Sequence, residues 1–295
     1  MRVALTGATG FIGSHVLTEL QEHGHDVTAL VRDDDQAGAV AARGAKATVV
    51  DLYDQPAVVG VLSESDAAIH TASPGDATSA DLDSAMVDAA IRAFEGTGKA
   101  YLHISGLWVF GDNISITEES PFNAPPLVAW KEPIERRLLN AKGVRGVVPI
   151  SSTAYGDGGG GTAMVLLGSP RDEDGNLIIL GSGRQHWSTV HVVDLADFFR
   201  RALESDSAHG YYVIGNGQRS TLAELTEAAA VAVAVGAEGA VPGSDQEARA
   251  RLGDYFAEVL LLDQGTDAAK ARSELGWRPT HPSLVDDFRE GSYRK

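Results

Sequence analysis

The chain has 295 residues, of which 43% are hydrophobic and 22% are charged, an ordinary composition for a soluble globular protein with a sizeable core. Its net charge of −17 argues against a nucleic acid or an anionic membrane as partner, because both bind through Lys and Arg. The absence of cysteine excludes disulfides and thiolate catalysis. We expect a cytoplasmic protein, since the N-terminal strand leaves no room for a signal peptide.

The first half of the chain alternates short apolar runs with helical patterns. The clearest helical patterns cover 80–97 and 130–141, and an earlier one ends at Gly24. Apolar strands that alternate with helices indicate a parallel sheet covered on both faces. The sequence therefore predicts an α/β fold of the doubly wound, Rossmann type. The expected strands are 2–7, 26–31, 45–51, 66–72, 100–106 and 144–151.

Beyond residue 151 the chain becomes rich in glycine and turns. A short strand and a helix are predicted within 188–204, with Asp194 as the helix cap, followed by a strand at 210–216 and an apolar helix at 222–235. We expect a dinucleotide-binding domain and a smaller substrate lobe. The expected bounds are 1–155 for the first, with 188–216 returning to it, and 156–187 together with 217–295 for the second.

The stretch "TGATGFIG" places three glycines at a three-residue spacing between a strand and a helix. Gly7 allows a tight turn, Gly10 allows a pyrophosphate to approach, and Gly13 allows close packing of helix and strand. The helix N-terminus presents free N–H groups and the positive end of its dipole to phosphates. This context predicts a dinucleotide cradle rather than a glycine-rich turn without a ligand. Its expected residues are Gly7, Thr9, Gly10, Phe11, Ile12 and Gly13.

The end of the second strand selects the cofactor. A carboxylate there binds a ribose 2′-hydroxyl, whereas an arginine accepts a 2′-phosphate. Arg32 follows the strand directly, and Arg43 could help it, so we favour NADP(H). Asp33, Asp34 and Asp35 follow at once and argue for NAD(H), because they repel a phosphate.

Two further strand ends are expected to complete the cofactor site. Asp51 and Leu52 end the third strand, where they can accept from an adenine amino group and cover the ring. Asp51 has an alternative interpretation as the cap of a helix over 54–60. The fourth strand ends in Thr71, Ala72 and Ser73, which can reach the nicotinamide ribose or the substrate.

An ordered series of motifs resembles the short-chain dehydrogenase/reductase superfamily, in its extended branch of epimerases, dehydratases and carbonyl reductases. The series runs nearly the whole length: "TGATGFIG", "AIHTAS", "HISGLWVFGD", Lys131 with Glu135, "STAYGDG", "VHVVDLADFF" and "LGWRPT". The resemblance implies an NAD(P) cofactor and a dimer formed through helices 80–97 and 126–141. No metal site is predicted.

The resemblance implies a tyrosine that acts as the acid and a lysine four residues later. Lys131 matches the lysine, which in the family also holds the nicotinamide ribose, but Leu127 occupies the position of the tyrosine. No lysine in the chain has a tyrosine four residues before it. The family's substrate-binding hydroxyl falls on Gly106, so Ser105, just before it, is the nearest substitute; its alternative role is a backbone hydrogen bond.

Other side chains are candidates for the missing proton. Tyr155 borders the substrate in the family, where it more often packs; His186 lies in a turn that can face the site; a water relayed through Ser105 and Lys131 is a third source. The expected substrate pocket consists of Trp108, Leu127, Trp130 and His186.

Three functions remain open from the sequence. The first is an NADP(H)-dependent reductase of a small organic carbonyl, imine or enone, with an atypical active site. The second is a nucleotide-sugar epimerase or dehydratase, which the missing tyrosine disfavours because that chemistry abstracts a hydroxyl proton. The third is a non-catalytic NAD(P)-binding sensor or partner protein.

Overall fold

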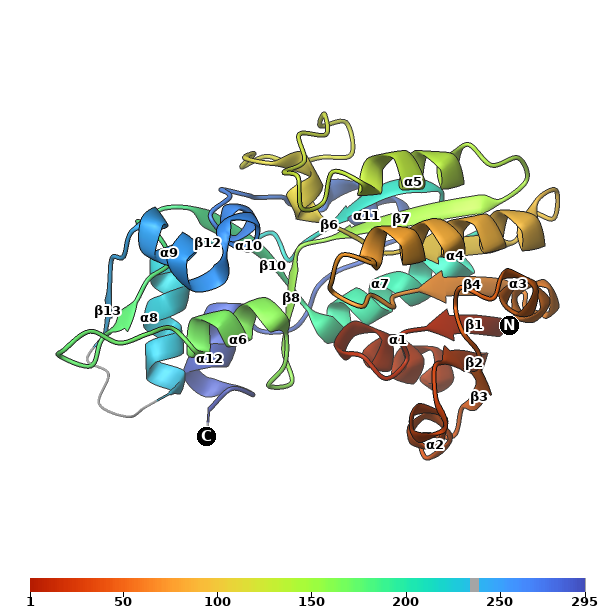
Figure 1. Ribbon diagram of the computed structural model, residues 1–295, viewed down its shortest axis with the longest axis horizontal. Helices are drawn as coiled ribbons and strands as arrows, with labels where there is room; N and C mark the ends of the chain where they lie inside the picture. The colour runs from red at the N-terminus through yellow and green to blue at the C-terminus, as the bar shows by residue number, and fades with distance from the viewer. Residues whose placement is uncertain (234–238, 295) are drawn as a thin grey trace.

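The computed structural model describes residues 1–233 and 239–294, and it places the chain in two packed bodies (Figure 1). The larger body is built on a sheet whose strands follow the order β11-β7-β5-β4-β1-β2-β3, with β6 beside β7. All of its neighbouring strands are parallel. The strands are β1 (Arg2–Thr6), β2 (Asp26–Val31), β3 (Lys46–Val49), β4 (Ala67–His70), β5 (Ala100–His103), β6 (Ser105–Gly106), β7 (Arg145–Ser151) and β11 (Gly210–Ile214).

Helices cover both faces of this sheet, because its strands are apolar on both sides. Val3 and Leu5 of β1 face a core shared with α1 (Phe11–Glu22) and α7 (Val192–Glu204), while Ala4 between them faces the opposite core. That opposite core contains α3 (Gln55–Glu64), α4 (Ser79–Phe94) and α5 (Lys131–Leu139). The short α2 (Asp34–Ala41) packs on β2 and β3, and α11 (Ala269–Glu274) packs on β11. The predicted doubly wound α/β fold is confirmed.

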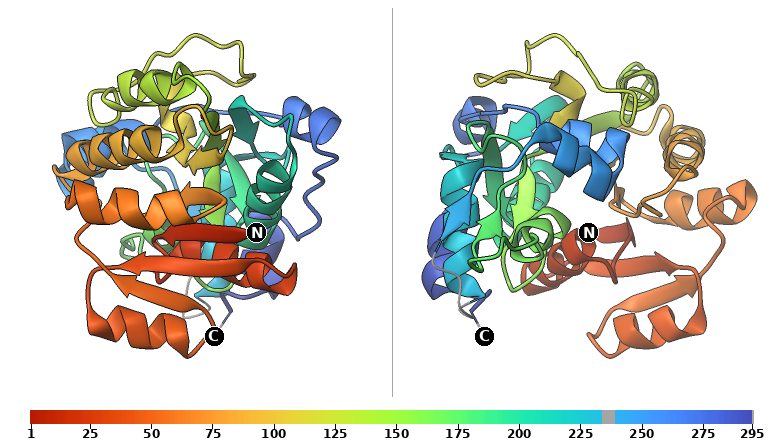
Figure 2. Two further views of the ribbon diagram at one scale, coloured as in Figure 1. Left: turned by 90° about the vertical axis from the view of Figure 1, so that its right-hand side faces the viewer. Right: turned by 60° about the vertical axis from the view of Figure 1, so that its left-hand side comes forward.

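The smaller body has its own sheets and its own core. Three strands pair in the order β12-β10-β8, and β9 pairs with β13. Figure 2 shows from two sides that most of the C-terminal helices lie around this sheet, away from α2 and β3, whereas α11 lies on β11 of the larger body. The elements are β8 (Thr153–Tyr155), α6 (Gly161–Leu167), β9 (Leu177–Ile178), β10 (His186–His191), β12 (Arg219–Thr221), α8 (Leu222–Ala232), β13 (Ala240–Val241), α9 (Asp245–Leu252), α10 (Asp254–Leu260) and α12 (Leu284–Glu290).

The predicted return of 188–216 to the larger body can be compared with these elements. Helix α7 and strand β11 lie on the large sheet, whereas β10 belongs to the three-stranded sheet. The domain boundaries themselves stay a prediction. The predicted helix 222–235 begins as expected, and its last two residues lie outside the described part of the chain.

Two predicted helix caps were wrong. Asp194 does not cap α7; the imidazole of His191 accepts from the backbone N–H of Val193 at 3.3 Å instead. The Asp194 carboxylate accepts from the backbone N–H of Thr280 at 3.0 Å, because it faces the C-terminal segment. Likewise Asp54, not Asp51, caps α3 through the N–H of Ala57.

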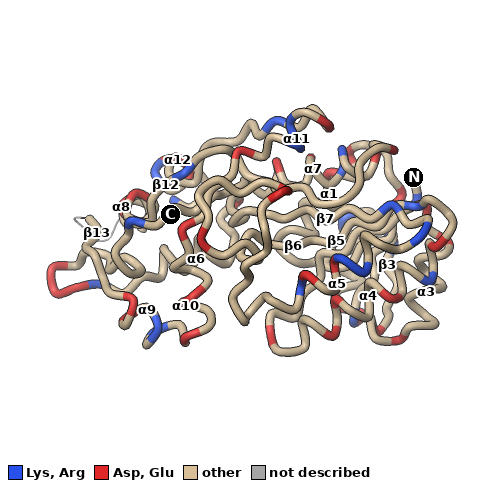
Figure 3. The backbone as a smooth tube through the Cα atoms, turned by 90° about the horizontal axis from the view of Figure 1, so that it is seen from above, with Lys and Arg blue, Asp and Glu red and all other residues tan. Residues whose placement is uncertain are grey.

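Charged residues are distributed over both bodies, so the net charge of −17 is not confined to one end (Figure 3). Across the described residues, every helix is too short or too polar to cross a membrane.

Candidate active site

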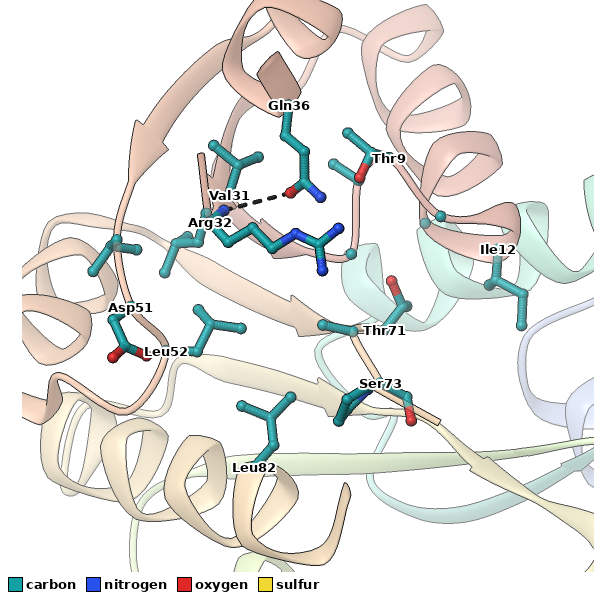
Figure 4. Close-up of a pocket in the computed structure, with 18 of the residues that line it drawn as sticks. Thr9, Ile12, Val31, Arg32, Gln36, Asp51, Leu52, Thr71, Ser73 and Leu82 are labelled. Carbon is teal, nitrogen blue, oxygen red and sulfur yellow. Dashed lines mark hydrogen bonds between the residues drawn. The ribbon is translucent and has the colours of Figure 1, made fainter. Parts of the chain in front are cut away.

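A cavity of about 780 Å³ opens where β1, β2 and β4 end, in front of the first turn of α1 (Figure 4). Every residue predicted from the sequence to bind the cofactor lines this cavity, with the exception of Lys131. The sequence reading missed several lining residues, which carry no motif of their own. These are Ala8, Leu30, Val31, Gln36, Val50, Tyr53, Pro74, Thr78 and Leu82.

The glycines of the cradle are required by space as well as by conformation. Gly7 has a φ of +77°, and a Cβ there would lie 2.7 Å from the backbone nitrogen of Ala72. A Cβ on Gly13 would lie 2.1 Å from the carbonyl oxygen of Gly7, so the helix and the strand could not approach as they do. Gly10 is the N-cap of α1 and has no side chain to cap it, so the first N–H groups face the cavity. These features fit a dinucleotide pyrophosphate.

The segment that follows β4 packs against this turn. The hydroxyl of Thr71 donates to the carbonyl oxygen of Thr6 at 2.8 Å and lies against the Gly7 turn. Ser73 lies further along the same wall, where its hydroxyl is 3.4 Å from that of Ser79. The two hydroxyl groups therefore come from one wall of the cavity, as Figure 4 shows.

Arg32 and Asp33 occupy different environments at the end of β2. The Arg32 side chain is 81% exposed and extends into the cavity beside Gln36 (Figure 4). The Asp33 carboxylate caps α2 by accepting from the N–H of Gln36 at 2.8 Å, and it also pairs with Arg32 at 3.3 Å. Arg43, by contrast, donates to Ser14 of α1 at 2.7 Å and does not line the cavity.

The far wall of the cavity comes from the loop after β3. Asp51 and Leu52 lie there, and the Asp51 carboxylate accepts from the N–H of Tyr53 at 3.0 Å. The hydroxyl of Tyr53 reaches the carbonyl oxygen of Thr78 at 3.3 Å. This bond joins the loop to the start of α4 and closes one side of the cavity.

Lys131 begins α5 and is held by a buried carboxylate. Its Nζ lies 3.0 Å from Oδ2 of Asp83, a residue of α4 that is 4% exposed. The same carboxylate faces Nε2 of His103 at 3.1 Å and Nε2 of His70 at 3.3 Å. Burial raises the pKa of Asp83, but the hydrogen bonds from the two histidines and the charge of Lys131 outweigh it, so the pKa lies well below its ordinary value. Sequence reasoning missed Asp83 and the two histidines that hold it.

Leu127 and Trp130 lie in the turn that leads into α5, next to Lys131. The indole N–H of Trp130 donates to the carbonyl oxygen of Leu127 at 2.9 Å, and the Lys131 Nζ lies 4.5 Å from the centre of the Trp130 ring. The Leu127 side chain is exposed. Trp108 lies between the two bodies, with its ring edge against Phe256 of α10. Of these three predicted pocket residues, Leu127 and Trp130 therefore lie just before α5, and Trp108 lies at the contact with the smaller body.

Tyr155 and His186 belong to the smaller body. Tyr155 is fully buried, its hydroxyl donates to the carbonyl oxygen of Pro282 at 2.5 Å, and burial raises its pKa above the ordinary value. His186 lies 2.9 Å from the carboxylate of Asp263. Neither lines the cofactor cavity. We therefore do not propose Tyr155 as a proton donor, because its hydroxyl is already engaged.

Ser105 faces the interior beside α5, and its hydroxyl has no hydrogen-bond partner among the described protein groups. This hydroxyl lowers the pKa of Glu135, a nearby carboxyl group one helical turn after Lys131. The structure thus brings Lys131, Ser105 and Glu135 to one side of the sheet, behind the cavity.

Comparisons with known proteins place this geometry in context. Residues 3–215 match the sequence model of a family described as the NAD dependent epimerase/dehydratase family. An uncharacterized protein of Schizosaccharomyces pombe is 28% identical, over 99% of this chain and 100% of that protein. A "3-diazoavenalumate denitrifying reductase" of a Streptomyces species is 27% identical, over 97% and 98% of the two chains. The structure of human epimerase family protein SDR39U1, solved with NADPH, has a TM-score of 0.74 at 24% identity and covers 99% of both chains.

Proposed function

The chain belongs to the NAD dependent epimerase/dehydratase family, and from this premise we propose that it is an NADP(H)-dependent oxidoreductase that reduces a small organic carbonyl, imine or enone. Most of the matched relatives whose names state a function are enzymes. One of them, named as a reductase, matches this chain over nearly its whole length. The glycine cradle has the tight turn at Gly7 and the uncapped helix N-terminus that suit the pyrophosphate of an NAD(P) cofactor.

The observation that favours NADP(H) is that Arg32 and Asp33 occupy different environments. Asp33 is the residue that would bind a ribose 2′-hydroxyl, but its carboxylate is engaged as the cap of α2. Arg32 keeps its guanidinium exposed in the cavity, where it can accept a 2′-phosphate. The human relative solved with NADPH shows that this family includes NADPH-binding members.

When bound, the cofactor supplies the hydride. The protein's own residues would hold the cofactor's phosphates through the first turn of α1 and its ribose near Thr71 and Ser73. Lys131 does not line the cavity but would contribute a positive charge from α5, where Asp83 fixes its position. Leu127 contributes no acidic proton, and the loss of such an acid costs roughly 10² to 10⁴ in rate. An activated enone, whose product anion is already stabilised, and an iminium, whose product is a neutral amine, need the acid least, so these substrates are favoured.

The test is a fluorescence titration of the purified protein with NADPH and NADH, on the wild type and on Arg32→Ala. A lost charge-assisted hydrogen bond costs about 1.5–3 kcal/mol, so we expect NADPH to bind about 10- to 150-fold more weakly to the variant, with NADH unchanged. Arg171→Ala, a surface arginine far along the chain in a turn, is the control. Tighter binding of NADH than NADPH by the wild type would contradict the cofactor choice.

Turnover is then measured by NADPH oxidation with carbonyl, imine and enone substrates. Reduction of one class supports the proposal. NADPH binding without reduction of any of them would favour the non-catalytic sensor instead.

A further inference from the structure

Five buried residues beside α5 carry polar atoms without a partner among the described protein groups. They come from β5, β6, α5 and β11, on the face of the sheet that α4 and α5 cover. Buried polar atoms nearly always have partners, so such a group marks ordered water or chemistry. The atoms are Tyr101 Oη, His103 Nδ1, Ser105 Oγ, both carboxyl oxygens of Glu135, and Tyr211 Oη.

Glu135 is the one carboxyl group in this cluster. Its exposed fraction is 0%, and it follows Lys131 by four residues, so both lie on the same side of α5. A carboxylate without a donor is costly in a buried position, whereas a neutral acid is not. Burial accordingly raises the pKa of Glu135, against the opposing effects of Ser105 and Lys131.

Some of the groups around Glu135 raise its pKa and others lower it. Asp83 of α4 and Glu132 of its own helix raise its pKa further through their negative charges. Tyr211 of β11 and Arg136 of α5 also lie within its electrostatic reach. Two neighbouring anions are costly, so the negative charge of Asp83 favours the neutral form of Glu135.

We propose that Glu135 is a proton store for Lys131: a neutral carboxylic acid behind the active site that restores the lysine's proton through one ordered water. This inference rests on the proposed reductase function. Glu135 acts through Lys131 and does not touch the substrate, so it is a positioning residue rather than a catalytic one.

The proton balance is as follows. After the substrate has gained a hydride, its oxygen or nitrogen anion takes a proton from the Lys131 ammonium, so that one N–H bond breaks and one O–H or N–H bond forms. The water between Lys131 and Glu135 then passes the carboxyl proton to the neutral amine. The Asp83 charge stabilises the ammonium that this transfer forms and opposes the negative charge that it leaves on Glu135. Solvent returns a proton to the Glu135 carboxylate before the next turnover.

His103 is the alternative proton source in the cluster, and its geometry argues against it. Its Nε2 donates to Asp83, and its Nδ1 has no partner. Burial lowers the pKa of His103 to about 4, with Asp83 opposing, so the ring is neutral near pH 7 and has no spare proton. It holds Asp83 in place instead.

The experiment uses infrared difference spectroscopy together with kinetics. Glu135→Gln has the shape of a neutral acid but cannot release a proton. At neutral pH we expect the wild type to show the carbonyl band of a protonated carboxylic acid, which the variant lacks. The variant should bind NADPH as before, lose roughly 10² or more of its turnover, and show a larger solvent isotope effect. Glu135→Asp should recover part of the rate.

Asp88→Asn is the control, because it removes a surface carboxylate of the neighbouring helix α4 that pairs with Arg137. It should change neither the band nor the turnover. Absence of the band in the wild type would overturn the proposal, and so would full activity in Glu135→Gln.

Failure of the reductase function is distinguishable from failure of the proton store. In Lys131→Met the Glu135 band should shift, because the bridging water loses its second partner; this readout needs no turnover. A band that does not move in Lys131→Met would show that the two groups are not coupled and would overturn the proposal, whichever reaction the protein performs.

Discussion

Lys131 and Asp83 join α5 to α4 through an ion pair of 3.0 Å between Nζ and Oδ2. Asp83 is buried and accepts from two histidines as well, so this carboxylate has three donors. A lysine that is held in this way keeps one position relative to the cradle. In the proposed active site, a lysine held by Asp83 stands where the resemblance implies a tyrosine and lysine pair.

Removal of the Asp83 charge should therefore destabilise the protein. In Asp83→Asn the amide can accept from fewer donors and leaves Lys131 without its counter-charge. Breaking one side of a buried pair typically costs about 3–5 kcal/mol. We expect the free energy of unfolding, measured by urea denaturation, to fall by about that amount. Asp88→Asn, on the exposed face of the same helix, is the control. An unchanged unfolding midpoint in Asp83→Asn would mean that the ion pair contributes nothing.

Stability should also depend on pH through His103. Its pKa in the folded protein lies near 4, below the ordinary value of 6.5, so the unfolded chain binds more protons between these values. The contribution is present above pH 6.5 and is lost as the pH falls from 6.5 to 4, by about 3 kcal/mol at most. Replacement of His103 by Gln, which keeps a donor toward Asp83, should flatten the stability profile in this window. His209→Gln, at the surface, should not.

The parts of the site that could be predicted from the sequence are those set by local spacing. The cradle glycines depend on a turn of a few residues, and the strand ends at Arg32, Asp51 and Thr71 follow from where apolar runs stop. Asp83 could not be found in this way, because an aspartate in a helical pattern resembles a surface residue. Its partner Lys131 lies 48 residues further on, and only the fold brings them together.

The same limit explains the misplaced expectations. Tyr155 stands in a motif that borders the substrate in the resembled family, yet its hydroxyl is bound by Pro282, which lies 127 residues away. Asp194 precedes a helical pattern as a cap would, but Thr280 and His281 of the C-terminal segment make four hydrogen bonds to it. Contacts with the end of the chain decide both cases, and no local pattern reports them.

Gly13→Ala should abolish cofactor binding. Its Cβ would lie 2.1 Å from the Gly7 oxygen, so α1 would have to move away from β1. Overpacking of this kind costs about 1–3 kcal/mol of stability, and the displaced helix N-terminus would no longer meet the pyrophosphate. We expect no detectable NADPH binding by fluorescence titration. Gly60→Ala is the control, since no atom lies within 4 Å of its Cβ and it lies inside α3, where alanine should add about 0.5–1 kcal/mol. Wild-type affinity in Gly13→Ala would contradict the proposed cradle.

Leu127→Tyr should restore an acid to the site. Leu127 is exposed and lies in the turn four residues before Lys131, so a phenol there has room and can approach the lysine charge. We expect alcohol dehydrogenation and carbonyl reduction to rise by roughly 10² or more, since a positioned acid contributes 10² to 10⁴. Leu127→Phe supplies the same ring without the hydroxyl and should leave both rates at the wild-type level. The measurement is NADP(H) turnover with alcohols and ketones across pH. Equal rates in the tyrosine and phenylalanine variants, both folded and both binding NADPH, would show that the missing tyrosine is not what limits the reaction, and Lys131 with its buried support would then be sufficient by itself.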